Sequence, residues 1–163
     1  MTVTPLRDTS SAAPAHLDKK WQHRFLTLAK MWGEMCSKDP SKKVGAVIVD
    51  DHRRVIAMGY NGFPRGVRDD AERYNDKATK LNMVVHAEAN AILNAVKSVE
   101  GGTLFVWPRF TCHECAKLVI QSGITHVIGP APQTGSSWAE SQQVALQMYA
   151  EAGVTTGFWE GEL

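Results

Sequence analysis

The sequence predicts a single α/β domain in which helices cover both faces of a β-sheet. Two apolar runs separated by a short polar turn, residues 44–49 and 55–60, indicate a β-hairpin. From residue 85 onward, helical and strand patterns alternate, which is typical of parallel strands covered by helices. The length of 163 residues suits one domain with a core large enough to fold without disulfides.

The domain is expected to follow an N-terminal arm. Residues 1–17 are small, polar and interrupted by proline, so we expect a flexible arm there and a single domain over residues 18–163. Asp18 is a candidate N-cap for a helix whose apolar residues recur every three or four positions. This apolar stripe consists of Trp21, Phe25, Leu28, Trp32 and Met35.

The other elements follow from apolar runs and the residues that end them. Residues 61–82 are glycine-rich and then charged, which indicates a long loop, and such loops in compact domains are usually functional. Gly123 and Gly153 stand in the usual position after a helix C-terminus. The expected helices span residues 86–99, 112–122 and 138–152, and the expected strands span residues 103–107, 125–129 and 154–159.

Charge and cysteine content restrict the class of function. The formal net charge is +1, so no global field attracts nucleic acid or a membrane surface, although a local pocket could bind a small anion. Three cysteines, an odd number, do not fit the disulfide framework of a small secreted chain. We see no signal peptide and no apolar run of membrane-spanning length, and we expect a cytoplasmic protein without nucleic-acid or membrane partners.

Three residues form a candidate zinc site. His86, Cys112 and Cys115 supply one nitrogen and two sulfur ligands, which leaves a fourth position open as in catalytic zinc sites. The C-x-x-C spacing places both sulfurs one turn apart at a helix start, where unpaired backbone N–H groups favour thiolates. Thr111 fits the first position of an S/T-x-x-E capping box, so we expect the helix to begin at Cys112. The expected cofactor is one catalytic zinc ion per chain.

Glu88 is the candidate catalytic proton carrier. In mid-helix, His86 and Glu88 would point about 200° apart, so both serve one site only if the metal lies off the N-terminal end of their helix. Glu88 could then take a proton from water and return it to a ring nitrogen and a leaving amine. A redox cysteine pair and a purely structural zinc are the alternatives. Nothing else suggests thioredoxin, and His113 is a poor fourth ligand.

The candidate site residues lie within longer segments whose sequences match a known family pattern. Residues 86–88 are HAE and residues 111–115 are TCHEC, similar to the H-x-E and P-C-x-x-C pattern of zinc deaminases. Further matching segments are SKDPS (37–41) leading into VGA (44–46), GYNGFPRG (59–66), VHAEANAI (85–92) and CAKLVIQSGI (115–124). From Trp21 to Phe158 the chain therefore resembles the deoxycytidylate (dCMP) deaminase family of the zinc-dependent cytidine deaminase superfamily.

The resemblance implies a fold, a reaction and two substrate contacts. The fold is a three-layer α-β-α arrangement with a five-stranded mixed sheet in the order 2-1-3-4-5. The reaction is hydrolysis of dCMP to dUMP and ammonia, in a homo-oligomer (hexamer or dimer) regulated by dCTP and dTTP. Asn61 matches the asparagine that hydrogen-bonds the sugar hydroxyl, although its local sequence also suits a turn. Arg65 is a candidate phosphate contact or a solvated loop arginine, with Lys42 and Lys43 as weaker candidates.

Two departures from the family pattern leave the substrate open. Thr111 stands where the family usually has proline, and residues 129–137 lack the usual tyrosine, with Trp138 as the nearest aromatic residue. The same zinc site could therefore deaminate another nucleoside, a modified pyrimidine nucleotide or a base. The remaining alternative is a catalytically silent regulator that binds dCTP or dTTP. Glu88 argues against silence, because proton transfer is the obvious reason for a carboxylate at that position.

Overall fold

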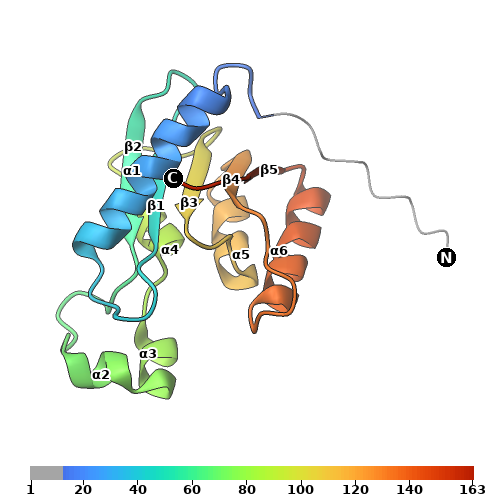
Figure 1. The fold of residues 1–163 in the computed structure, drawn as a ribbon. Helices are drawn as coiled ribbons and strands as arrows, with labels where there is room; N and C mark the ends of the chain where they lie inside the picture. Colours follow the sequence, from blue (N-terminus) through green and yellow to red (C-terminus); the bar gives the residue numbers. More distant parts are fainter. Residues whose placement is uncertain (1–12) are drawn as a thin grey trace.

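The computed structural model describes residues 13–163, which form a β-sheet between two layers of helices (Figure 1). The strand order is β2-β1-β3-β4-β5, which confirms the predicted sheet. β1 pairs antiparallel with β2 and β3, whereas β3, β4 and β5 run parallel. The strands are β1 (Gly45–Val49), β2 (Val55–Tyr60), β3 (Thr103–Trp107), β4 (His126–Pro130) and β5 (Thr155–Trp159).

Helices cover both faces of the sheet, as predicted. On one face, α1 (Lys19–Cys36) packs against β1, β2 and β3. The other face carries α4, α5 and α6, which are joined through one shared apolar core. Their bounds are α4 (Ala87–Leu93), α5 (His113–Gln121) and α6 (Ala139–Ala152). The helix α5 directly follows β3, whereas α4 is reached from β2 through residues 61–86. Because β2 and β3 are both antiparallel to β1, they end at the same edge of the sheet, and the N-termini of α4 and α5 lie there.

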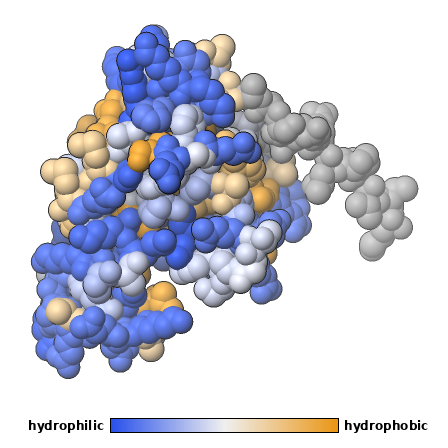
Figure 2. All heavy atoms as spheres, in the orientation of Figure 1, coloured by the Kyte–Doolittle hydropathy of each residue, from blue (hydrophilic) through white to orange (hydrophobic). Residues whose placement is uncertain are grey.

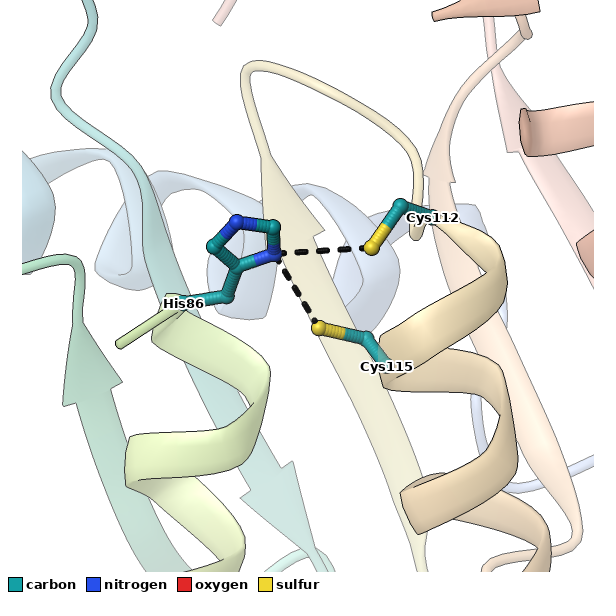
Figure 3. A group of neighbouring side chains, drawn as sticks. All are labelled: His86, Cys112 and Cys115. Atoms are coloured by element: carbon teal, nitrogen blue, oxygen red, sulfur yellow. Dashed lines mark hydrogen bonds between the residues drawn. The ribbon is translucent and has the colours of Figure 1, made fainter. Parts of the chain in front are cut away.

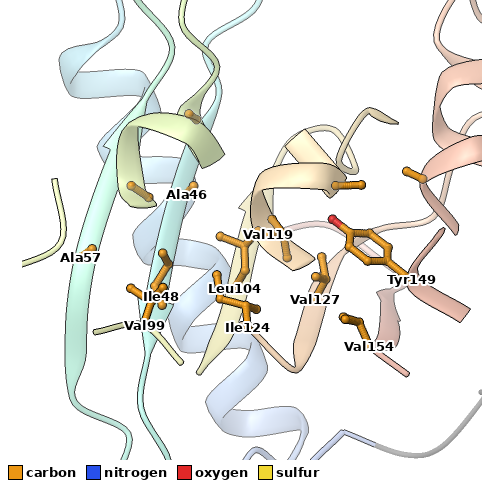
Figure 4. Packing of buried hydrophobic residues seen from close by; sticks show 14 of the residues in the cluster. Ala46, Ile48, Ala57, Val99, Leu104, Val119, Ile124, Val127, Tyr149 and Val154 are labelled. Atoms are coloured by element: carbon orange, nitrogen blue, oxygen red, sulfur yellow. The ribbon is translucent and has the colours of Figure 1, made fainter. Parts of the chain in front are cut away.

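The two cores divide the strand residues by alternation. Ala46 and Ile48 of β1 belong to the core under α4, α5 and α6, whereas Val47 and Val49 belong to the core under α1. Successive strand side chains point to opposite faces, so a strand buried on both faces is a continuous apolar run. In the core on the α4–α6 side, the labelled side chains include those of Ile48, Leu104, Val119, Val127 and Tyr149 (Figure 4).

The N-terminal helix begins where predicted and buries much of the predicted stripe. The Asp18 carboxylate accepts a hydrogen bond from the Trp21 N–H at 3.0 Å, which confirms the N-cap. The buried apolar face of α1 includes Phe25, Leu26 and Ala29, whereas Met35 of the predicted stripe is 74% exposed. Phe25 of the predicted stripe is buried, and Trp21 and Leu28 pack against the same core, so the stripe is confirmed there and wrong at Met35.

The crossing of α1 and β1 gives a stability prediction. A Cβ atom on Gly45 would lie 1.8 Å from the Ala29 carbonyl oxygen and 2.8 Å from the Gly33 nitrogen, both backbone atoms of α1. Overpacking usually costs 1–3 kcal/mol and occasionally more, so for Gly45→Ala we expect a loss of about 3 kcal/mol in the free energy of unfolding, measured by urea denaturation. Gly62→Ala is the control, because its new Cβ would meet nothing closer than 3.6 Å. Equal losses in the two variants would contradict this account.

The segment expected to be a loop, residues 61–82, contains two short helices, so that prediction is wrong. They are α2 (Ala71–Asn75) and α3 (Lys77–Met83). The side chains of Asp70 and Asp76 cap them by accepting backbone hydrogen bonds. Helices of five and seven residues are too short for a periodic apolar signal, and α3 buries none of its residues.

The helix expected over residues 86–99 is also shorter than predicted. The helix α4 ends at Leu93, and the following residues form turns and bends. Leu93 and Val96 are 76% and 91% exposed, whereas Val99 is buried. Apolar residues beyond Leu93 therefore suggested a longer helical face than the one that packs on the sheet.

Hydrophilic residues cover most of the face shown in Figure 2, with small apolar patches between them. Residues 1–12 of the expected arm lie outside the described residues, and Leu17 at its end is fully buried in the core under α1. Among residues 13–163, no helix combines the length and the apolar character needed to cross a membrane.

Candidate active site

Two helix N-termini meet at the cluster formed by His86, Cys112 and Cys115. His86 is the N-cap residue of α4, and Cys112 is the N-cap residue of α5. The Nδ1 atom of His86 lies 3.4 Å from the sulfur of Cys112 and 3.4 Å from that of Cys115 (Figure 3). One ligand atom from each residue lies within 4.8 Å of the others. The fold thus brings together the three residues that the sequence indicated.

The spacing within this cluster fits a tetrahedral zinc ion. With Zn–N and Zn–S bonds of about 2.0 and 2.3 Å, tetrahedral angles set a nitrogen and a sulfur ligand about 3.5 Å apart. The observed nitrogen–sulfur distances are both 3.4 Å. One nitrogen and two sulfur donors also leave a fourth position, as catalytic zinc sites require. The cluster can therefore hold zinc and leave room for one further ligand.

Hydrogen bonds inside the cluster favour a thiolate. The hydrogen bond with Cys115, helped by one with His86, lowers the pKa of Cys112 to about 4 although burial opposes this. The pKa values of Cys115 and His86 are raised, and for each the main cause is its hydrogen bond to Cys112. A bound cation would displace the protons that these groups share, so metal affinity should fall in acid.

Glu88 lies beside the cluster as a buried carboxyl group. Its side chain is 4% exposed, and it lines a cavity of about 550 Å³ together with His86 and Cys112. Both His86 and Glu88 reach this cavity because His86 precedes the helix, with extended backbone angles of φ −70° and ψ 155°. Burial raises the pKa of Glu88, while the neighbouring His86 partly opposes the shift. A carboxyl group of this kind can hold a proton and release it again.

The capping box predicted for α5 is wrong. The Thr111 hydroxyl shares a hydrogen bond of 3.0 Å with the Tyr149 hydroxyl, and both residues are fully buried. Glu114 instead pairs with side chains of its own helix, and Cys112 makes no side-chain cap bond. The helix still begins immediately after Cys112, as expected. Thr111 therefore ties the approach to the first sulfur ligand to α6.

The two predicted substrate residues lie in different places. Asn61 lines the cavity; its Oδ1 accepts from the Val44 N–H at 2.8 Å, and its Nδ2 donates to the Lys42 carbonyl at 2.9 Å. Arg65 donates to the Asn94 side chain at 2.6 Å on the exposed surface. Within the described part of the chain, Arg65 is not among the residues that line the cavity. The fold thus brings Asn61, but not Arg65, to the cavity that His86 and Cys112 also line.

The cavity wall also carries cations that the sequence patterns did not indicate, or indicated only weakly, as ligand contacts. The lining cations are Lys42, Lys77, Lys80 and Arg109. Lys80 is neutralised by Asp39, whose carboxylate lies 3.2 Å away. Lys77 and Lys80 lie on α3, the helix that the sequence pattern did not reveal. The available signal for Arg109 was its position three residues before the first cysteine ligand. The wall is therefore positive, as an anionic ligand would require.

Comparisons with known proteins agree with this geometry. A family model for the cytidine and deoxycytidylate deaminase zinc-binding region matches residues 19–129. The chain is 42% identical over 137 residues to an uncharacterized deaminase in the luxG 3' region of Aliivibrio fischeri, covering 83% of this chain and 90% of the relative. It is 39% identical over 142 residues to deoxycytidylate deaminase of Mus musculus, covering 83% and 78%.

A solved structure shows the same fold. The dCMP deaminase from the cyanophage S-TIM5, in complex with dCMP and dUMP, superposes with a TM-score of 0.70 at 23% sequence identity. The match covers 87% of this chain and 98% of the phage chain. The three-layer arrangement and the mixed sheet are therefore those of a known deaminase fold.

Proposed function

The chain belongs to the cytidine and deoxycytidylate deaminase family, and we infer that it hydrolyses dCMP to dUMP and ammonia with zinc as cofactor. The observation that carries this conclusion is the buried Glu88 carboxyl group in the same cavity as the cluster of one histidine and two cysteines. A redox pair or a structural metal site would not need a buried carboxyl group there. A silent nucleotide-binding regulator would not need one either.

His86, Cys112 and Cys115 would hold the zinc ion. When bound, the ion supplies Lewis acidity, which lowers the pKa of water and makes it nucleophilic near neutral pH. The protein contributes fixed ligand positions, because two of the three ligands occupy helix N-caps on a packed sheet. Burial of both cysteines limits solvent access to the sulfur atoms.

Glu88 would move the protons of the reaction. Its carboxylate takes a proton from the attacking water and delivers it to N3 of the pyrimidine ring. It then transfers the second water proton to the amino group, which leaves as ammonia when the C4–N bond breaks. The raised pKa of Glu88 suits this work, because the group must accept and release protons near the working pH.

Asn61 would meet the sugar of the nucleotide, and it also supports the backbone before β1. Its Oδ1 has a second lone pair besides the one used by the Val44 N–H. For Asn61→Ala we expect weaker dUMP binding together with a loss of about 1–3 kcal/mol in the free energy of unfolding, because the Val44 and Lys42 backbone groups lose their partner. Titration calorimetry and urea denaturation separate the two effects. If the dUMP affinity were unchanged, Asn61 would have only the structural role of supporting the turn.

The assembly, the effectors and the location of the protein stay predictions. A homo-oligomer, hexameric or dimeric, is supported by the exposed apolar residues Leu93 and Val96 at the end of α4. Light scattering with and without dCTP or dTTP tests both the assembly and the effectors. Cytoplasmic location agrees with the three free cysteines of the chain.

The test of the proposed function is ammonia release from a panel of substrates. The zinc-loaded protein is assayed with dCMP, CMP, deoxycytidine, dCTP, 5-methyl-dCMP and guanine. We expect the highest kcat/KM for dCMP. A preference for deoxycytidine or guanine would assign a nucleoside or base deaminase to the same metal site.

A further inference from the structure

Resting on the proposed function, we propose that Arg109, held against Trp138, binds the phosphate of the nucleotide substrate and thereby selects nucleotides over nucleosides. The sequence alone had favoured Arg65 for this contact. The two arginines differ in burial, in partners and in position relative to the cavity, and each difference favours Arg109.

Arg109 is a cation without an anionic partner. Its guanidinium group forms no ion pair and no side-chain hydrogen bond among residues 13–163. Arg109 is half-buried, and burial lowers its pKa, while the charges of Glu88 and Asp39 only partly oppose the shift. An arginine that has lost water without gaining an acceptor is stabilised by an anion that offers several oxygen atoms. Arg65, by contrast, is exposed and already bonded to Asn94.

Trp138 fixes the orientation of Arg109. The guanidinium carbon lies 4.8 Å from the centroid of the Trp138 ring system. A guanidinium group stacked on an aromatic face keeps its N–H groups free at the edge, where they can bind a phosphate with two hydrogen bonds. The Trp138 ring in turn lies 6.0 Å from the His86 ring, edge to face. Trp138 is therefore a common neighbour of the arginine and of a metal-ligand residue.

A nucleotide is long enough to span from the metal-ligand cluster to Arg109. The guanidinium carbon of Arg109 and the His86 ring both lie close to Trp138, at 4.8 and 6.0 Å from its ring, so their separation is no more than about the length of a nucleoside monophosphate. A base that presents its amino group at the cluster could thus extend its phosphate to Arg109 in the same cavity. The lining cations Lys42 and Lys77, which form no ion pair within residues 13–163, are exposed, so water already solvates them. They would add attraction with less selectivity than the arginine.

The experiment measures binding and turnover in parallel. Zinc-loaded wild type and Arg109→Gln are titrated by calorimetry with dUMP and with deoxyuridine, and kcat/KM is measured for dCMP and deoxycytidine. We expect Arg109→Gln to weaken dUMP binding roughly 10- to 100-fold, the range for hydrogen bonds to charged groups, while deoxyuridine binding stays unchanged. The ratio of kcat/KM for dCMP to that for deoxycytidine should fall by a similar factor.

Two further arginine variants make the result specific. Arg24 stacks on Trp21 at 4.5 Å and does not line the cavity, so Arg24→Gln should leave the preference for dUMP unchanged. If Arg65→Gln weakened the binding of dUMP alone and Arg109→Gln did not, the assignment of Arg109 would be overturned. The same holds if Arg109→Gln weakens both ligands equally, or if the wild type binds deoxyuridine as tightly as dUMP.

A conservative variant protects the test against misfolding. Arg109→Lys keeps the charge but not the planar pair of donors, so we expect a smaller loss that is again confined to dUMP. An equal loss for dUMP and deoxyuridine in this variant would also overturn the proposal. The binding measurements do not depend on catalysis. If dCMP is bound but not deaminated, the proposed function fails while the phosphate contact is still decided.

Discussion

Glu88→Gln is expected to lower kcat on dCMP by three orders of magnitude or more, with zinc content and melting temperature retained. A single general acid–base group contributes about 10²- to 10⁴-fold, and Glu88 serves more than one proton transfer, so the loss should lie at the upper end. Glutamine has nearly the same shape and needs no charge in a site where burial already disfavours the carboxylate. The fold should therefore tolerate the change.

The matched control for this variant is Glu114→Gln. Glu114 is a carboxylate next to a metal-ligand cysteine, but it is exposed and pairs with Lys117. It should keep near-normal turnover, because exposed ion pairs contribute little. Turnover is measured by ammonia release, zinc by mass spectrometry and folding by thermal denaturation. If Glu88→Gln retained a tenth of the wild-type rate, Glu88 would be a structural residue and the proton-transfer mechanism would be wrong.

Loss of either sulfur ligand should remove both the metal and much of the stability. Cys112→Ala and Cys115→Ala leave two protein ligands, so we expect the zinc content to fall from about one ion per chain to a small fraction. A ligand present at 1,000 times its Kd stabilises the native state by about 4 kcal/mol, and these variants forfeit that contribution. Their melting temperatures should then match that of the wild type after chelation.

Cys36→Ala supplies the control for the cysteine variants. Cys36 ends α1 and is a free cysteine outside the cluster, so its replacement should leave zinc content unchanged. Calorimetric melting with and without a chelator checks the prediction. If Cys115→Ala bound as much zinc as the wild type, this cluster would not be the metal site. The same conclusion would follow if chelation left the melting temperature of the wild type unchanged.

Local patterns in the sequence predicted most of the elements because their causes are local. The run 44–49 is apolar because β1 is buried on both faces, and residues 103–107 are apolar for the same reason. In residues 55–60 only the middle of the strand is buried, because β2 lies at the edge of the sheet. Gly123, with φ of 80°, ends its helix in the left-handed region as expected. The short helices α2 and α3 escaped prediction because they are held by single aspartate caps and bury little apolar surface.

The candidate metal ligands were also visible in the sequence, since residue type and spacing along one helix start restrict what can bind zinc. The sequence by itself therefore determined the donor set His86, Cys112 and Cys115, the carboxyl group at Glu88, and the family resemblance. Zinc accepts few ligand types, and the C-x-x-C spacing lets both sulfurs face one ion.

The tertiary structure decided everything that depends on residues distant along the chain. It showed that Glu88 is buried, that Thr111 bonds to Tyr149 rather than capping its helix, and that Arg109 rather than Arg65 lines the cavity. Burial and pairing are properties of a packed neighbourhood, and no local pattern records which side chains from other elements will complete it. The physical reason is that desolvation and hydrogen bonding act through space, so the pKa of a carboxyl group or the availability of an arginine is set only when the elements meet.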